Sequence, residues 1–362
     1  MAYPNMASNG PLAGVRILEF GGIGPGPFAA MLLGDMGADV VRIDRPNAPH
    51  ETMLARGKRS IALDMKAPDD KRIAAELAQQ ADILIEGFRP GVMERLGFGP
   101  EGMLKTNPKL VYGRMTGWGQ HGPLAQAAGH DLNYIALSGA LHAIGPKDGP
   151  PVPPLNLVGD FGGGSLYLVM GLLAALTHAR ATGEGQIVDA AMTDGAISLM
   201  GLFYGLRSED RWADARQSNF LDGAAPFYRC YQCSDDKWVS IAAIEPQFWA
   251  ELRQRLSLSD PLFDAQHDQR CWPEISAKLE AIFLNRSRDE WCTLLEGSDV
   301  CFAPVLSMTE APQHPHNRSR GSFTHDLQAN VAPRFSVTAG QNPLPPPQTD
   351  ADRDSILKDW LG

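Results

Sequence analysis

The sequence predicts an α/β fold in which a large domain with a doubly wound parallel sheet is joined to a smaller α+β domain. Three observations predict it. Between residues 15 and 192, short apolar runs typical of buried strands alternate with helical patterns. The glycine-rich turn Gly21-Gly-Ile-Gly-Pro-Gly-Pro27 follows the first of these runs. Near residue 207 a polar stretch ends the alternation, and a hairpin pattern begins beyond it.

The elements of the large domain follow from the length and the apolar pattern of each segment. Strands are predicted at residues 15–20, 39–44, 61–64, 81–86 and 110–115, and a further strand begins at Gln186. Helices are predicted at residues 28–36, 70–79, 161–179 and 194–206. The long third helix is expected to have Asp160 as its N-cap and Gly183 just beyond its end.

The domain boundaries follow from the change in pattern. The large domain is expected to span residues 1–206 and to be completed by the C-terminal segment 320–362, which closes with a short helix at 350–360. Residues 207–224 form a linker, residues 225–305 the small domain and residues 306–319 a return linker. The small domain opens with a hairpin and continues with helices near residues 247–256, 273–284 and 287–295.

Composition narrows the function classes. With 44% hydrophobic and 20% charged residues, the chain has ordinary globular values. A net charge of −10 argues against nucleic-acid partners and anionic membrane surfaces. The apolar run at 166–176 is too short to span a bilayer, and the N-terminus lacks the features of a signal peptide. Five cysteines, an odd number, favour a reducing compartment, so a soluble, cytoplasmic protein is expected.

A cluster of basic residues stands out in this acidic chain: Arg42, Arg45, Arg56, Lys58, Arg59 and Lys66. One interpretation is a solvated face, because runs of charge usually lie in water. The other is a binding site for phosphate groups, because guanidinium and ammonium groups bind phosphate well. Two further arginines, Arg89 and Arg95, follow a predicted parallel strand at the end where open α/β sheets bind ligands.

Several familiar motifs fail in detail. The glycine-rich turn places Pro27 where a dinucleotide fingerprint needs Gly or Ala, so nicotinamide binding is not expected. Cys230 and Cys233 lack a second cysteine pair, and residues three apart on a strand face opposite ways, so the pair is expected to be structural. No metal ligands are predicted. His314 and His316 are expected in a surface loop.

Two residues remain as candidates for acid/base chemistry. His130 lies between a glycine and Asp131, in a segment expected to enter a helix, where backbone N–H groups are placed to meet an oxyanion. Asp160 is followed, after Phe161, by three glycines, which are expected to leave room for a ligand to approach. A histidine is more often a packed or surface residue, and an aspartate at a helix start is ordinarily a cap.

The motifs as a set resemble the family III CoA-transferase superfamily and, within it, the α-methylacyl-CoA racemase branch. The matching motifs lie at residues 22–27, 37–46, 86–97, 115–123, 129–134, 153–164 and 243–248. They run in order along most of the chain. The resemblance implies an interlocked homodimer, a branched-chain acyl-CoA substrate in lipid metabolism, and no separate cofactor, because CoA is part of the substrate.

The resemblance also implies roles for individual residues. His130 and Asp160 match the two acid/base groups, and Glu245 matches a glutamate of the small domain that supports the histidine across the dimer. The positions that match the CoA-binding residues are Arg45, Lys66, Gly87, Phe88, Arg89, Arg95, Gly129, His130, Asp131, Leu132, Asn133 and Tyr134.

A pair of acid/base residues is what the reaction of the racemase branch requires. Inverting a stereocentre beside a thioester requires one group to remove a proton and another to return one on the opposite face. The alternative is a CoA-transferase in which Asp160 is the nucleophile. A covalent transferase needs no opposed second base, and the glycine-rich loop of the transferase small domain is missing between residues 225 and 305.

Overall fold

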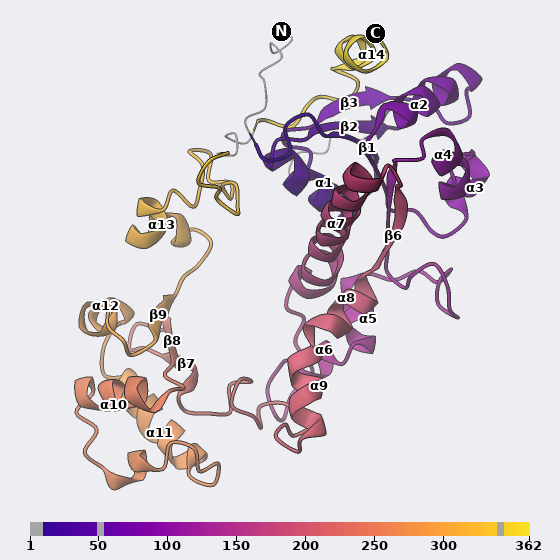
Figure 1. Cartoon of the computed structure of the whole chain (residues 1–362). Helices are drawn as coiled ribbons and strands as arrows, with labels where there is room; N and C mark the ends of the chain where they lie inside the picture. The colour runs from indigo at the N-terminus through magenta and orange to yellow at the C-terminus, as the bar shows by residue number, and fades with distance from the viewer. Residues whose placement is uncertain (1–9, 49–53, 339–343) are drawn as a thin grey trace. The chain divides into compact units, whose positions relative to one another are not determined.

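The computed structural model describes residues 10–48, 54–338 and 344–362 and divides the chain into two compact units (Figure 1). Unit 1 comprises residues 1–140, 153–201 and 328–362, and unit 2 comprises residues 141–152 and 202–327. The C-terminal segment therefore returns to the first unit. The sequence places residues 141–152, 202–206 and 320–327 in the large domain, whereas here they belong to unit 2.

Unit 1 is built on a six-stranded parallel sheet. Its strands are β1 (Arg16–Phe20), β2 (Asp39–Asp44), β3 (Arg59–Ala62), β4 (Ile83–Glu86), β5 (Val111–Thr116) and β6 (Gln186–Ala191). The strand order is β3-β2-β1-β4-β5-β6, so the direction of winding changes between β1 and β4. At such a switch point a crevice forms beyond the carboxyl ends of the strands. The predicted doubly wound parallel sheet is confirmed.

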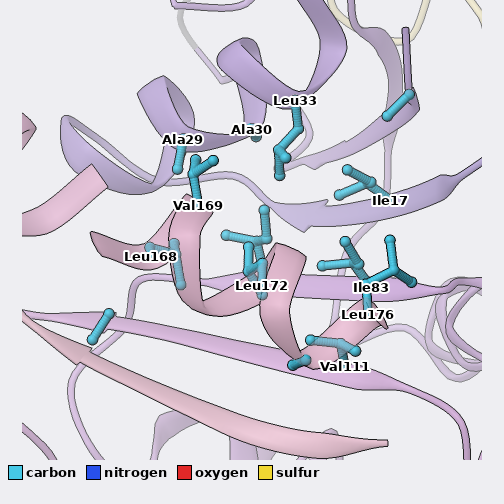
Figure 2. Packing of buried hydrophobic residues seen from close by; sticks show 14 of the residues in the cluster. Ile17, Ala29, Ala30, Leu33, Ile83, Val111, Leu168, Val169, Leu172 and Leu176 are labelled. Carbon is cyan, nitrogen blue, oxygen red and sulfur yellow. The ribbon is translucent and has the colours of Figure 1, made fainter. Parts of the chain in front are cut away.

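Helices cover both faces of this sheet. On one face α1 (Pro25–Asp35) and α7 (Tyr167–Thr182) pack on Ile17, Ile83 and Val111 through the residues labelled in Figure 2. On the other face α2 (Pro68–Gln80), α4 (Pro100–Thr106) and α14 (Arg353–Leu361) contact the next residue along each strand, including Leu18, Leu84 and Tyr112. Alternate strand residues thus supply two cores, which explains the continuous apolar runs.

Six other short helices of the chain lie outside these two layers. They are α3 (Val92–Leu96), α5 (Asp131–Leu137), α6 (Ala140–Ala143), α8 (Met192–Leu199), α9 (Gly201–Ser208) and α13 (Pro315–Ser319). The helix predicted at 194–206 is wrong as a single element, because α8 ends with Met200 as its C-cap and α9 begins at the next residue.

The helix predicted to start at Asp160 also differs. It is preceded by a π-helical segment, η1 (Leu157–Leu166), whose N-cap is Asn156. Asp160 therefore lies within the first turn of η1, and its predicted role as an N-cap is wrong. The physical reason is that another carboxylate, Asp131, accepts the N–H groups at the start of η1. Gly183 does end α7, in a left-handed conformation, as predicted.

Four of the six clustered basic residues are held in ion pairs. Arg42 pairs with Asp44, Arg56 with Asp35, Lys58 with Glu19, and Arg59 with both Asp39 and Asp359. The first three pairs are buried, so Arg42, Arg56 and Lys58 form neither a solvated face nor a phosphate-binding site. Arg42 pairs within β2, whereas the partners of Arg56, Lys58 and Arg59 lie on other elements, which the sequence pattern does not reveal. Arg45 and Lys66 remain exposed.

Unit 2 has its own core beneath a three-stranded antiparallel sheet. Its strands β7 (Tyr228–Gln232), β8 (Trp238–Ala242) and β9 (Phe302–Val305) lie in that order, and its main helices are α10 (Pro246–Arg255), α11 (Trp272–Phe283) and α12 (Arg288–Leu295). The predicted hairpin and three helices are confirmed, and β9 was not predicted. Phe227, Tyr231 and Phe283 are among the fully buried side chains of this core. Cys233 is buried and Cys230 exposed, as expected for opposite strand faces.

The stretch Leu157–Thr182 is long and apolar enough to cross a membrane by length and composition alone. It is longer than the apolar run identified from the sequence, because η1 and α7 are continuous. Leu168, Leu172 and Leu176 of this stretch pack in the core of unit 1, where they contact the sheet (Figure 2). Core helices of soluble proteins commonly pass the same test.

Candidate active site

A cavity of about 350 Å³ lies in unit 1 at the carboxyl ends of β1, β4 and β5. Its wall includes the ends of the three strands, the loop at residues 22–27, the loop at 87–90 and the segment from 125 to 130. His130 and Asp160, the two predicted acid/base residues, both line it. The cavity therefore occupies the crevice that the strand order predicts.

The loop at residues 22–27 forms one wall of this cavity. Gly24 is the N-cap of α1 and has a φ of 68°, a left-handed conformation that favours glycine. A Cβ atom at Gly24 would lie 3.5 Å from Asp160 Oδ2. The hydroxyl of Ser165 donates hydrogen bonds to the carbonyls of Pro25, at 2.8 Å, and Asp160, at 3.0 Å. The glycine-rich turn thus shapes the surroundings of Asp160.

His130 stands at the start of α5. It is the N-cap residue of that helix, and its backbone N–H donates to Asn133 Oδ1 at 3.1 Å. Its side chain is exposed. The prediction that His130 enters a helix is confirmed. Asn133, predicted as a CoA-binding residue, uses its side chain to close the first turn of α5.

Tyr134 fixes the loop before His130. Its hydroxyl donates to the carbonyl of Gly129, and its ring lies edge-on to Trp118, with centroids 4.8 Å apart. The ring fills the space that two glycines leave, because a Cβ atom would lie 2.1 Å from it at Gly117 and 2.8 Å at Gly129. Burial, and then the negative charge of Asp160, raise the pKa of Tyr134, so its hydroxyl stays a donor.

Asp160 is half-buried in the first turn of η1. Its Oδ2 accepts a hydrogen bond from the side-chain amide of Asn156 at 3.2 Å. Burial raises the pKa of Asp160, and the negative charge of Asp131 raises it further, while the Asn156 hydrogen bond and the charge of His130 act in the opposite direction. A carboxyl group with a raised pKa is suited to carry a proton during a reaction.

The three glycines after Phe161 do not leave room for a ligand. A Cβ atom at Gly163 would lie 2.6 Å from the backbone nitrogen of Ala196, and one at Gly164 would lie 2.8 Å from Met192. Both contacts are with α8, which packs directly against η1. The predicted use of this glycine run for ligand approach is therefore wrong, since the space is filled by a neighbouring helix.

A buried ion-pair network supports the loop at residues 87–90. Glu86, at the end of β4, is 1% exposed, and its Oε2 accepts the backbone N–H of Phe88 at 2.8 Å. Arg114 on β5 donates to Glu86 Oε1 at 3.0 Å and to Glu94 at 2.9 Å. Burial raises the pKa of Glu86 to about 6 despite these partners. The network thus fixes the loop at residues 87–90, which forms part of the cavity wall.

The predicted CoA-binding residues fall into three groups. Gly87, Phe88, Arg89, Gly129, His130 and Tyr134 line the cavity. Arg45, Lys66, Arg95, Leu132 and Asn133 are exposed and lie outside its lining, while Asp131 is buried. The structure thus brings one group together around His130 and Asp160 and leaves the basic side chains Arg45, Lys66 and Arg95 on the surface of unit 1.

Glu245 belongs to unit 2. It is the N-cap residue of α10, and its side chain is exposed. After burial, the nearby charge of Glu245 is the main cause of the raised pKa of the Cys301 thiol. The proximity of Cys301, which follows Val300 just before β9, fixes where Glu245 lies within its own unit.

Sequence reasoning missed several residues that line the cavity. Ile23 in the glycine-rich loop is 80% exposed, and Trp118, Thr116 and Met192 contribute to the wall from the strand ends and α8. The signal for Trp118 was present in the motif at 115–123, which follows β5. The rejected dinucleotide motif was the signal for Ile23, because a glycine-rich turn at the carboxyl end of a first strand borders the ligand crevice whatever the ligand.

Comparison with known proteins identifies the family. The model of "CoA-transferase family III" matches residues 12–353. The chain belongs to the family III CoA-transferases. The α-methylacyl-CoA racemases of Mus musculus and Homo sapiens are each 42% identical to it, over 92% and 89% of this chain and 88% and 85% of theirs. The acetyl-CoA:oxalate CoA-transferase of Acetobacter aceti is 31% identical over 86% of this chain and 85% of its own.

A solved structure shares the fold of this family III chain. The "CAIB/BAIF family protein from Brucella suis" has a TM-score of 0.84 and 24% identity, and the match covers 98% of this chain and 100% of the other. At that identity the likeness concerns the fold. The resemblance to the family that the motifs indicate is therefore confirmed along nearly the whole chain.

Proposed function

We propose that this chain is an α-methylacyl-CoA racemase that interconverts (2R)- and (2S)-2-methylacyl-CoA thioesters. The observation that carries the proposal is that His130 and Asp160, far apart in sequence, line one cavity at the carboxyl ends of the strands. The relatives named as racemases are 42% identical, against 31% for the oxalate CoA-transferase. Both findings favour the racemase branch of the family.

The reaction needs two acid/base groups and one bound thioester. In one direction His130 takes the proton from the α-carbon, and the electron pair of the broken C–H bond moves onto the carbonyl oxygen as an enolate. Asp160 then returns a proton to the opposite face of that carbon, and the carbonyl re-forms. In the other direction the two residues exchange roles. The raised pKa of Asp160 suits it to both roles.

Stabilising the enolate requires a hydrogen-bond donor near its oxygen. We assign this role to backbone N–H groups at the start of α5, whose N-cap residue His130 lines the cavity. We assign the CoA part of the substrate to Gly87, Phe88 and Arg89 at the cavity and to the exposed cations Arg45, Lys66 and Arg95. CoA is part of the substrate, so the proposed reaction uses no resident cofactor.

The proposal includes a homodimer with shared active sites. In it Glu245 of one subunit supports His130 of the other, as the family resemblance implies. Leu166, Met170 and Leu202 are among the exposed apolar side chains that a second copy would cover. We also infer a cytoplasmic enzyme of lipid metabolism, in keeping with its five free thiols. Sedimentation of the purified chain tests the dimer, and a monomer with full activity would contradict it.

The chemistry is tested with one stereochemically pure 2-methylacyl-CoA in D₂O. The expected result is deuterium at the α-carbon together with a mixture of both epimers. Transfer of CoA between two carboxylic acids, with no deuterium at the α-carbon, would instead support the transferase alternative with Asp160 as nucleophile. Binding of the thioester with neither reaction would mark the chain as a non-catalytic acyl-CoA-binding protein.

A further inference from the structure

Asp131 is a buried carboxylate directly behind the two proposed acid/base residues. It follows His130 in the chain, is the first residue of α5 and is 6% exposed. Its Oδ2 accepts the backbone N–H groups of Gly159 and Asp160, each at 2.7 Å. One side chain thus joins the helix that begins after His130 to the turn that carries Asp160.

The local sequence makes room for this contact. A Cβ atom at Gly159 would lie 2.6 Å from Asp131 Oδ2, closer than real Cβ atoms come, so the carboxylate reaches the two amides only because residue 159 is glycine. The amides at the start of a helical segment have no partners within it and attract a carboxylate. Asp131 provides that partner from another element.

The contact between Asp131 and the two amides includes a negative charge that capping alone does not require. Among the described residues, Asp131 Oδ1 is buried without a hydrogen-bond partner, and burying such a group is costly. A neutral amide oxygen would accept the same two N–H groups. The carboxylate brings a negative charge to this point, and its neighbour in space is the carboxyl group of Asp160.

We propose that Asp131 is a positioning residue that fixes the Asp160 carboxyl group relative to His130 for proton return to the α-carbon. The inference rests on the proposed racemase function and assigns a task to a residue predicted only as a CoA contact. Because Asp131 is adjacent to His130 in the chain and accepts the backbone N–H of Asp160, its carboxylate links the backbone segments that carry the two acid/base groups. Asp131 itself touches no reacting atom.

The charges around Asp160 agree with this role. Asp131 raises the pKa of Asp160 in addition to the larger effect of burial, while the Asn156 hydrogen bond and the charge of His130 lower it. Tyr134, also on α5, has its own pKa raised by burial and by the charges of Asp160 and Asp131, and lowered by Arg89. Asp131 therefore helps Asp160 to hold a proton.

Two substitutions of Asp131 distinguish the effect of its hydrogen bonds from the effect of its negative charge. Asp131→Asn keeps an oxygen that can accept both N–H groups but removes the negative charge, whereas Asp131→Ala removes both. Asp222 in unit 2 provides a matched control, because its carboxylate also accepts two consecutive backbone N–H groups, those of Ser218 and Asn219, at 2.9 and 3.0 Å. Asp222→Asn and Asp222→Ala carry the same chemical changes at a residue that does not line the cavity.

The measurement is α-deuterium incorporation and inversion from each pure epimer in D₂O, as a function of pH. In Asp131→Ala, inversion is expected to fall about 100-fold. For the epimer whose proton faces His130, deuterium exchange without inversion should persist. In Asp131→Asn, inversion should fall less, and the limb of the pH profile that belongs to Asp160 should move to lower pH, because a nearby negative charge is lost. The Asp222 variants should keep the wild-type ratio of inversion to exchange and the wild-type profile.

The outcomes separate the two claims. If the wild-type chain gives neither exchange nor inversion, the proposed function fails. If the wild type inverts its substrate, and both Asp131 variants keep its ratio of inversion to exchange and its pH profile, Asp131 has only a structural role and the inference is overturned. Asp131→Asn retains the hydrogen bonds to η1, so it decides the matter even if Asp131→Ala fails to fold.

Discussion

Two glycine-rich segments border the same region of unit 1 and serve opposite purposes. The loop at 22–27 lines the cavity, and a Cβ atom at Gly22 or Gly26 would meet nothing within 4 Å. The run at 162–164 is packed against α8, and added Cβ atoms there would collide with backbone or side chains. Glycine thus leaves open space in the cavity wall in one segment and gives space to a neighbouring helix in the other. The sequence alone does not distinguish these uses.

The largest effect is expected where glycine serves helix packing. In Gly163→Ala the new methyl group would lie 2.6 Å from the backbone nitrogen of Ala196, which cannot move without shifting α8. We expect a loss of stability of about 3 kcal/mol or more, because overpacking against backbone is costly. The melting temperature checks this. A variant as stable as the wild type would show that η1 and α8 are not tightly packed.

A third part of the cavity wall is held by a buried charge rather than by glycine. The pKa of Glu86 is raised by burial from 4.5 to about 6, so the folded state holds the proton more tightly than the unfolded state. Its ionisation therefore lowers stability as pH rises between about 4.5 and 6, by about 2 kcal/mol in all. In Glu86→Gln this contribution is absent.

The stability difference between wild type and Glu86→Gln should therefore shift by about 2 kcal/mol against the wild type as pH rises from 4 to 7. Chemical denaturation of both proteins at several pH values measures it. A constant difference across that range would contradict a raised pKa for Glu86.

A moderate effect is expected where a cavity glycine also has a left-handed conformation. Gly24 has a φ of 68°, so Gly24→Ala is expected to cost about 1 kcal/mol of stability. Its methyl group would enter the cavity 3.5 Å from Asp160 Oδ2, and we expect epimerisation to slow about tenfold. Steady-state kinetics and the melting temperature check the two effects. Unchanged kinetics would place the substrate away from this loop.

The smallest change in stability is expected at Gly22. Its position is open and its φ is not left-handed, so Gly22→Ala should change stability by less than about 0.5 kcal/mol. Because Gly22 lines the cavity, the KM for acyl-CoA should nevertheless rise. The pair Gly22→Ala and Gly163→Ala is thus a matched test of the comparison. Equal losses of stability in the two variants would refute it.

The parts of the fold that repeat a local pattern were predictable. The strands β1, β2, β4 and β5 follow from apolar runs, and β2 was predicted with its observed bounds. The third strand differs from its predicted bounds, because β3 begins with the polar Arg59 and Ser60, whose side chains are hydrogen-bonded to Asp39 and Asp44 at the two ends of β2. A strand that carries paired charges does not resemble an apolar run.

The parts that depend on distant contacts were not predictable from the residues. The ion pairs of Arg56 and Lys58 use partners 21 and 39 residues away, and the cap of η1 comes from Asp131, 28 residues before Gly159. The pair His130 and Asp160 was identified because its motifs resemble a family. Local chemistry alone makes each of them a candidate, beside the interpretation as an ordinary packed or surface residue or a helix cap.

The central claim is that His130 and Asp160 act on opposite faces of one carbon. Measuring α-deuterium exchange of each pure epimer by His130→Ala and Asp160→Ala tests it most directly. Neither variant should invert its substrate, and the two should retain exchange for opposite epimers, because each keeps one base. Exchange of the same epimer by both variants, or inversion that survives in the double variant, would contradict the account.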